Sequence, residues 1–306
     1  MTTLAEHAED YLRLRRALGF KLTDYGDSLA NFVAYVDASG TGRVTSELAA
    51  SWAWLPPGIK PITASFRISW VRGFARYLHA IDAAHEVPPS GLIAVPRRRP
   101  APYLYSPEQV RAVLAKAQRL RPPLRAATFK TLFGLLAATG MRVGEALALS
   151  IVDVDLDEGM LTIKHAKFDR RRLVPLHPSV TAALGKYATT RDRHRRTLRT
   201  DRFFVCETGC SLDRRQAEQV FAKITEQLGL RTHTVHPRIH DLRHTFAVQT
   251  LIGWQRDGSD VAAMLPVLST YLGHVEPKST YWYLSATPEL MQLAATRLEH
   301  HFDGRS

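Results

Sequence analysis

A proline-rich segment, residues 87–105, most constrains what this chain of 306 residues can fold into. It holds five prolines and a run of three arginines, and its apolar residues follow no helical or strand period. Proline fixes the backbone and removes a hydrogen-bond donor, so such a segment favours an extended path between folded units. We therefore predict a first domain over 1–86, a linker over 87–105 and a second domain over 106–306, each domain long enough to bury a core.

The first domain has the pattern of a small helical bundle. Helices are expected from Thr3, from near Asp27, from Thr45 and after Thr63, with glycines or prolines between them. The last of these is the clearest, because six apolar residues recur at helical spacing. They are Phe66, Trp70, Phe74, Tyr77, Leu78 and Ile81.

The second domain combines helices with a short stretch of strands. Ser106, followed by Pro107 and Gln109, has the form of a capping box that opens a helix. Further helical patterns surround three short apolar runs that indicate an antiparallel sheet: 152–155, 161–163 and 172–176. The predicted fold is mainly α, with a helical N-terminal bundle and a mixed α/β domain that contains a small antiparallel sheet.

Basic residues are in clear excess. Forty-one Lys and Arg stand against 29 Asp and Glu, a formal net charge of +12, which makes a polyanion the first partner to consider. Three arginines lie off the apolar stripe of the fourth predicted helix, and three more stand together in the linker. Each group of arginines either lies on a solvated surface or contacts phosphates. These candidates are Arg67, Arg72, Arg76, Arg97, Arg98 and Arg99.

Several classes of protein do not fit this sequence. No apolar run approaches the ~18 residues of a membrane-spanning helix, and the first residues lack the pattern of a signal peptide. A cytoplasmic protein is therefore expected. Cys206 and Cys210 are the only cysteines, too few for a disulfide framework, and no second cysteine pair accompanies them to complete a zinc site.

Four short segments carry chemically active side chains. Arg142 begins an R-x-x-E sequence after a helix-ending glycine, and Lys167 lies in the turn between two predicted strands. His240 and Arg243 form an H-x-x-R pair on one helical face, and a Gly-His pair is followed nine residues after its histidine by Tyr283. Each residue alone is typical of a surface ion pair, a turn lysine or a buried histidine. Their combination in this order indicates an active site.

In this order the segments resemble the tyrosine recombinases of the phage integrase and Xer type. The resemblance covers roughly 103–284, and residues 1–100 resemble the helical core-binding domain of that family in pattern alone. One departure is an interval between Arg243 and His274 that is longer than is usual in the family. The resemblance implies a site-specific recombinase or integrase, of the mobile-element kind, that cuts and rejoins DNA through a 3′-phosphotyrosyl intermediate. The implied catalytic residues are Arg142, Lys167, His240, Arg243, His274 and Tyr283.

The chemistry agrees with these implied roles. Attack of a tyrosine on a DNA phosphate builds negative charge on the nonbridging oxygens, which the bidentate guanidiniums of Arg142 and Arg243 can stabilise. A phenol is mostly protonated at neutral pH, so Tyr283 needs a proton acceptor, for which His240 is expected. Lys167 is the expected acid for the departing 5′ oxygen. The second histidine of the set would hydrogen-bond a nonbridging oxygen.

The resemblance also implies the partners of the protein. They are double-stranded DNA and further copies of the same chain, forming a homotetramer on two DNA sites and a monomer or dimer without DNA. Accessory recombinases are a further expectation. Neither a metal nor any other cofactor is required, and the protein is expected to associate with the nucleoid in the cytoplasm.

Alternatives stay open for both the residues and the function. Tyr271 and Tyr281 are rival nucleophiles and Lys164 is a rival acid, although the family spacing favours Tyr283 and Lys164 lies within a predicted strand. A DNA-relaxing topoisomerase of the type IB kind would share the chemistry. A catalytically silent architectural protein that binds DNA would share the fold.

Overall fold

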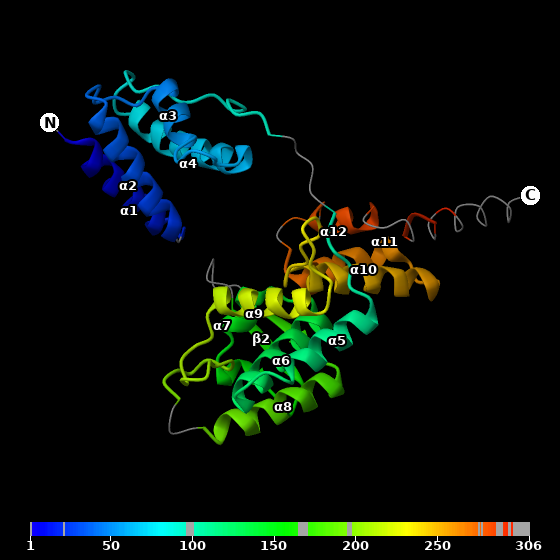
Figure 1. The fold of residues 1–306 in the computed structure, drawn as a ribbon. Helices are drawn as coiled ribbons and strands as arrows, with labels where there is room; N and C mark the ends of the chain where they lie inside the picture. The colour runs from blue at the N-terminus through cyan, green and yellow to red at the C-terminus, as the bar shows by residue number, and fades with distance from the viewer. Residues whose placement is uncertain are drawn as a thin grey trace, which may run out of the picture. The chain divides into compact units, whose positions relative to one another are not determined.

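In the computed structural model the chain divides into two compact units, residues 1–99 and 100–306 (Figure 1). The structure describes residues 2–20, 22–95, 101–164, 171–194, 198–274, 276, 278–285, 290–292 and 295. None of the helices within these ranges combines the length and apolar character that crossing a bilayer requires.

The first unit is a bundle of helices, as predicted. Its helices are α1 (Leu4–Ala17), α2 (Thr23–Ala38), α3 (Ser46–Ala53) and α4 (Pro61–His79). Thr3 and Glu6 form a capping box at the start of α1, and the Thr45 hydroxyl accepts the Leu48 N–H at the start of α3. These caps satisfy N–H groups that the first helical turn leaves without partners.

The buried face of α4 differs from the predicted apolar stripe. Phe74 and Leu78 are buried as expected, but Phe66 is 56% exposed and Ile81 is 54% exposed. The face that packs on α2 and α3 contains small residues, which let the helices approach closely and turn Phe66 outward. The buried residues of α4 are Ala64, Ile68, Val71, Phe74, Ala75 and Leu78.

The second unit surrounds a small sheet with helices (Figure 1). The predicted capping box is present, because Gln109 N–H donates to Ser106 Oγ at 3.2 Å and Ser106 N–H donates to Gln109 Oε1 at 3.0 Å. Tyr105, just before this cap, is buried in the core of this unit. The helices are α5 (Pro107–Ala117), α6 (Pro123–Thr139), α7 (Val143–Ala148), α8 (Pro178–Asp192), α9 (Arg214–Gln227), α10 (Asp241–Arg256), α11 (Val261–Leu272) and α12 (Lys278–Tyr281).

The predicted antiparallel sheet is also present. Its strands β1 (Val154–Asp155), β2 (Met160–Lys164) and β3 (Arg171–Pro175) lie in sequence order, with Leu161 opposite Val174. The connection between β2 and β3, residues 165–170, lies outside the described residues.

The first strand is shorter than the sequence pattern suggested. Val152 was predicted to open it, but it lies in a 3-10 turn, Ile151–Asp153, and is 85% exposed. The Asp153 carboxylate accepts the backbone N–H of Ser150 at 2.9 Å and its hydroxyl at 2.6 Å. This local capping box competes with strand pairing at the start of β1.

A separate apolar cluster joins the last helices of the second unit. Helices α10, α11 and α12 lie together (Figure 1) and bury Leu251, Leu268, Leu272 and Tyr283 against one another. Helix α10 also packs on α6, and α11 contacts β3. Side chains from distant parts of the sequence are thereby brought to the C-terminal end of α11.

We expect Gly140→Ala to lower the free energy of unfolding by about 2–4 kcal/mol, from left-handed backbone strain together with overpacking. Gly140 ends α6 with φ +61°, and a Cβ there would lie 2.5 Å from the Phe246 ring. Urea unfolding of the full chain measures the change. The control is Gly144→Ala in α7, where no atom lies within 4 Å of the added Cβ, so stability should stay within about 1 kcal/mol. Equal midpoints for the two variants would contradict this account.

Candidate active site

The last turn of α11 accepts hydrogen bonds from three arginines. The final carbonyls of a helix have no partner within the helix and carry its negative dipole end, so they attract cations. The three arginines come from the start of α7, from β3 and from α10, and they meet here. The pairs are Arg172 Nε to the Tyr271 carbonyl at 3.1 Å, Arg243 Nη2 to Leu272 at 3.0 Å and Arg142 Nη2 to Gly273 at 3.1 Å.

The residue at the end of α11 has to be glycine. Gly273 has φ +69°, in the left-handed region that favours glycine. A Cβ at this position would lie 2.5 Å from Nη1 of Arg172. The Gly-His pair of the sequence therefore ends the helix and leaves space for a guanidinium.

Glu145 links two of these arginines. Its Oε1 accepts from Arg142 Nη1 at 2.8 Å and from Arg172 Nη1 at 3.0 Å, and its Oε2 accepts from Arg172 Nη2 at 2.8 Å. Burial alone would raise the pKa of Glu145, but the hydrogen bonds and positive charge of Arg172, and then of Arg142, lower that pKa to about 2. The carboxylate is therefore charged at neutral pH and fixes both guanidiniums.

Arg243 is buried beside this pair. It is 2% exposed, and its Nη1 donates to the Gly140 carbonyl at 2.8 Å. Burial, and then the positive charge of Arg142, lowers the pKa of Arg243 to about 10, so it remains a cation at neutral pH. Arg142 is more accessible, with 39% of its side chain exposed. One buried and one accessible guanidinium thus lie at the same helix end.

His274 follows directly after Gly273. Its Nδ1 lies 2.7 Å from the hydroxyl of Thr280, a residue that is 1% exposed. Burial, and then the charges of Arg243 and Arg142, lowers the pKa of His274 to about 4. The imidazole is neutral at neutral pH, and its contact with Thr280 leaves Nε2 for another partner.

Tyr283 lies in a 3-10 turn, Trp282–Ser285, that follows α12. The residue is 2% exposed, its ring is parallel to that of His274 with centroids 6.2 Å apart, and its Oη lies 3.0 Å from Nδ1 of His244. The sequence motif gave His244 no role in catalysis. The available signal was its position directly after Arg243 and one helical turn after His240.

Five of the six predicted catalytic residues lie together in the structure, in contact with one another or with a common neighbour. They are Arg142, Arg243, His274 and Tyr283, with His240 next to His244 at a ring-centroid distance of 4.8 Å. The His240 side chain is exposed, and partial burial, and then Arg243, lowers its pKa. The sixth, Lys167, lies outside the described residues.

The rival residues Tyr271, Tyr281 and Lys164 lie in other surroundings. Tyr281 is 53% exposed, and Tyr271 stacks on Phe246 with centroids 5.7 Å apart. Lys164 Nζ forms an ion pair with Asp153 Oδ1 at 2.5 Å. Tyr283 is thus the tyrosine whose hydroxyl meets the histidines of this site.

Besides His244, three further residues support the site and had no catalytic role assigned from the sequence. Glu145 was visible as the acid of R-x-x-E, and Arg172 opened a predicted strand. Thr280 was expected to shape the turn before Tyr283. Helical and strand patterns carry no information on contacts between distant segments, so these roles depend on the fold.

The arginines predicted to contact DNA in the first unit have different surroundings. Arg67 donates to the Leu55 carbonyl and stacks on Trp52, with Cζ 3.8 Å from the ring centre. Arg72 donates from Nε and Nη2 to the carbonyls of Pro88 and Pro89, both at 2.7 Å. Arg97, Arg98 and Arg99 lie outside the described residues.

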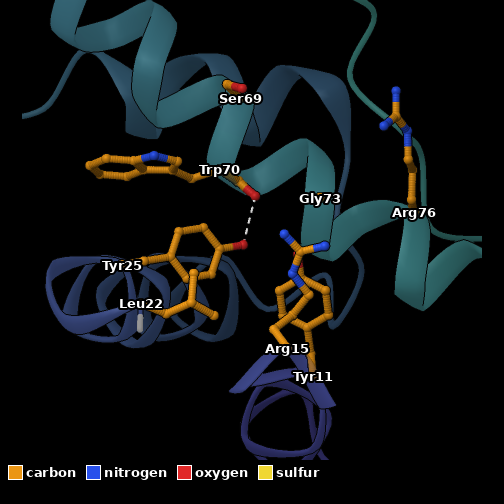
Figure 2. Close-up of a pocket in the computed structure, with 8 residues that line it drawn as sticks. All are labelled: Tyr11, Arg15, Leu22, Tyr25, Ser69, Trp70, Gly73 and Arg76. Carbon is orange, nitrogen blue, oxygen red and sulfur yellow. Dashed lines mark hydrogen bonds between the residues drawn. The ribbon is translucent and has the colours of Figure 1, made fainter. Parts of the chain in front are cut away.

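Arg76 lies at a pocket of about 630 Å³ between α1, α2 and α4 (Figure 2). Arg15 lines the same pocket from α1, together with Tyr11 and Trp70. The Tyr25 hydroxyl donates to the Trp70 carbonyl at 2.9 Å, the contact drawn in Figure 2. In Figure 2 the guanidinium of Arg15 lies beside the Tyr11 ring, whereas that of Arg76 points away from the aromatic rings.

Metal ligands do not cluster in the part of the chain that the structure describes, where no group of three or more His, Cys, Asp or Glu could hold an ion.

Comparison with known proteins gives consistent matches. A family model described as the phage integrase family matches residues 105–289. A protein of Sinorhizobium fredii (strain NBRC 101917 / NGR234), named "Putative integrase/recombinase y4rB", is 40% identical over 314 residues, which cover 100% of both chains.

Two solved structures have a similar fold. The XerH site-specific recombinase bound to palindromic difH substrate has a TM-score of 0.62 and 21% identity, covering 90% of this chain and 79% of that one. The Tn1549 transposon integrase in complex with a circular intermediate DNA has a TM-score of 0.67 and 15% identity, covering 95% and 99%. Both agree with the predicted mainly helical fold that contains a small antiparallel sheet.

We expect Glu145→Gln to lower the free energy of unfolding at pH 7 by up to about 3 kcal/mol, as a pKa lowered from 4.5 to about 2 implies. A lowered carboxyl pKa stabilises the folded state above the unfolded pKa, and this contribution is lost as the pH falls to the folded pKa. The difference between variant and native chain should therefore shrink as the pH falls from about 5 to 2. Chemical unfolding at several pH values measures it.

The control for this series is Glu158→Gln, which alters an exposed carboxylate of the same unit. It should change stability by less than about 0.5 kcal/mol throughout the pH range. If the effect of Glu145→Gln were independent of pH, the charge of Glu145 would not be the stabilising feature.

Proposed function

This chain belongs to the phage integrase family of tyrosine recombinases, and from that membership we propose how its residues cut and rejoin DNA. It is a site-specific recombinase/integrase, an enzyme that transfers DNA strands. In the proposed reaction Tyr283 attacks a DNA phosphate, forms a 3′-phosphotyrosyl linkage and releases a 5′-hydroxyl. The 5′-hydroxyl of another strand then attacks the linkage and restores a phosphodiester.

The observation that carries this proposal is the position of the phenol. Tyr283 lies against His274, which directly follows the helix end that holds Arg142 and Arg243. We assign the two arginines to the nonbridging oxygens of the phosphate. Nη2 of Arg142 donates to the Gly273 carbonyl and Nη2 of Arg243 donates to the Leu272 carbonyl. Each Nη2 carries a second hydrogen that can be donated to a phosphate oxygen.

The remaining roles concern protons and orientation. His274 would donate from Nε2 to a nonbridging oxygen, since its Nδ1 is in contact with Thr280. His240 stands at the exposed entrance to the same cluster. Lys167 would supply the proton to the departing 5′ oxygen, so that no alkoxide has to be released into solution.

The proposed partner is double-stranded DNA, bound by two domains. We assign 1–86 to a DNA-binding domain, 87–105 to a basic linker and 106–306 to the catalytic domain. Strand exchange between two sites requires four active sites, so we propose a homotetramer on two DNA duplexes that forms from monomers or dimers. The reaction would take place on DNA in the cytoplasm, with accessory recombinases as further partners.

In the first unit we assign phosphate contact to Arg76 together with Arg15. Both line the pocket of Figure 2, Arg15 beside the Tyr11 ring and Arg76 with its guanidinium turned away from the rings. Arg67 and Arg72 are assigned to the bundle itself, because they donate to carbonyls of Leu55, Pro88 and Pro89.

We expect Tyr283→Phe to abolish the covalent protein–DNA product, because the phenylalanine ring keeps the packing but has no nucleophile. DNA recovered from covalent complexes and sequenced at its ends would identify the site, which is then used as a nicked substrate. Denaturing gels measure the adduct. Tyr281→Phe and Tyr271→Phe are the controls and should retain it, while an adduct that persists in Tyr283→Phe would refute the assignment.

We expect Arg15→Ala and Arg76→Ala each to weaken binding of DNA and to reduce the slope of log affinity against log salt by about 0.9 per lost phosphate contact. Fluorescence anisotropy over a salt series measures both quantities. Arg13→Ala is the matched control, because it removes the same charge from an exposed ion pair with Asp10 on α1. Equal slopes for all three variants would argue against the pocket as a phosphate contact.

A further inference from the structure

The hydroxyl of Tyr283 contacts a histidine to which the sequence motif assigned no catalytic role. His244 lies on α10, one turn after His240, and its Nδ1 is 3.0 Å from the phenol oxygen. In the part of the chain that the structure describes, no hydrogen bond joins the His240 side chain to this phenol. The nearest imidazole nitrogen with a measured contact to the nucleophile therefore belongs to His244.

The surroundings of His244 fix the direction of its ring. The His240 ring lies edge-on to it at 4.8 Å between centroids, with an interplanar angle of 88°. On another side Trp282 makes an edge contact at 5.5 Å and 66°. These neighbours hold the imidazole in place, so the contact with Tyr283 belongs to a packed arrangement.

The protonation state of His244 suits an acceptor. Burial, and then the positive charge of His240 and of nearby arginines, lowers the pKa of His244 to about 4. At neutral pH the ring is neutral and has one nitrogen with a lone pair. A phosphate bound by Arg142 and Arg243 would add negative charge beside the ring and raise its affinity for a proton.

We propose that His244 accepts the proton of Tyr283 during strand cleavage, and this inference rests on the function proposed above. The proton passes from Oη to Nδ1 of His244 while the Oη–phosphorus bond forms. The bond from phosphorus to the 5′ oxygen breaks, and that oxygen takes a proton from the acid assigned to Lys167. In rejoining, an incoming 5′-hydroxyl gives its proton to the neutral amine of Lys167 as it attacks phosphorus, and Oη leaves and takes its proton back from His244.

This assignment changes the part given to His240. His240 is exposed at the N-cap of α10, whereas His244 is half-buried next to the phenol. His240 is then a neighbour that packs on the acceptor and faces the incoming DNA. In this proposal His244 carries out the proton transfer, and His240 is the histidine that meets the phosphate.

The test compares His244→Asn with His240→Asn on the nicked substrate. An asparagine oxygen accepts a hydrogen bond but cannot hold the proton, so His244→Asn keeps a positioning role and removes proton transfer. We expect the rate of adduct formation to fall at least ~100-fold with DNA affinity unchanged. A native rate in His244→Asn would overturn the proposal.

A second measurement separates proton transfer from loss of structure. Replacing Tyr283 by 3,5-difluorotyrosine supplies a much more acidic phenol, which needs no acceptor at neutral pH. In His244→Asn this replacement should raise the cleavage rate at least tenfold, and in His240→Asn and Arg142→Ala it should not. Rescue of His240→Asn alone, or no rescue in any variant, would overturn the proposal.

The same set of variants distinguishes a failure of the proposed function from a failure of the His244 proposal. Tyr283→Phe tests the proposed function, because an adduct that it retains would exclude Tyr283 as nucleophile and His244 as its acceptor with it. An adduct that depends on Tyr283 but is unaffected by His244→Asn would leave the proposed function intact and refute only the role of His244.

Discussion

The carbonyl groups at the C-terminal end of α11 are the acceptors on which the candidate active site depends. A guanidinium as buried as that of Arg243 is costly unless it is hydrogen-bonded, and the Leu272 and Gly140 carbonyls each accept one N–H from it. The adjacent carbonyls take Arg142 and Arg172. Three arginines and one carboxylate, Glu145, leave an excess of positive charge at this helix end. A phosphate group is the kind of ligand that would neutralise it.

Burial, with that positive charge as a smaller contribution, determines the state of the histidines. Burial, and then neighbouring cations, lowers the pKa values of His240, His244 and His274, so the imidazoles are neutral at neutral pH. Neutral rings can accept hydrogen bonds and protons, which cationic rings cannot. The arginines thus attract an anion, and they add to the effect of burial in keeping the histidines neutral until the anion arrives.

The sequence predicted the local features well because they depend on neighbouring residues. The capping box at Ser106, the glycine that ends α6 and the three-stranded sheet follow from short patterns. The face of α4 was predicted less well, because helical spacing alone does not reveal that small residues face the neighbouring helices. The contact between His244 and Tyr283 joins positions 39 residues apart, and no periodicity encodes it. The motif residues that the structure describes meet at the candidate site, whereas their hydrogen-bond partners could be identified only from the fold.

In the proposed reaction, the burial of Tyr283 would limit hydrolysis of the phosphotyrosyl linkage. The phenol is 2% exposed, whereas 39% of the Arg142 side chain is exposed, so DNA meets the arginine before it meets the nucleophile. Binding of the phosphate at the α11 end must therefore come before attack, and the energy of that binding can be used to align phosphorus with Oη. Once the linkage forms, the same packing by His274 and Trp282 limits the approach of water. A buried nucleophile thus favours transfer to a positioned 5′-hydroxyl over loss to solvent.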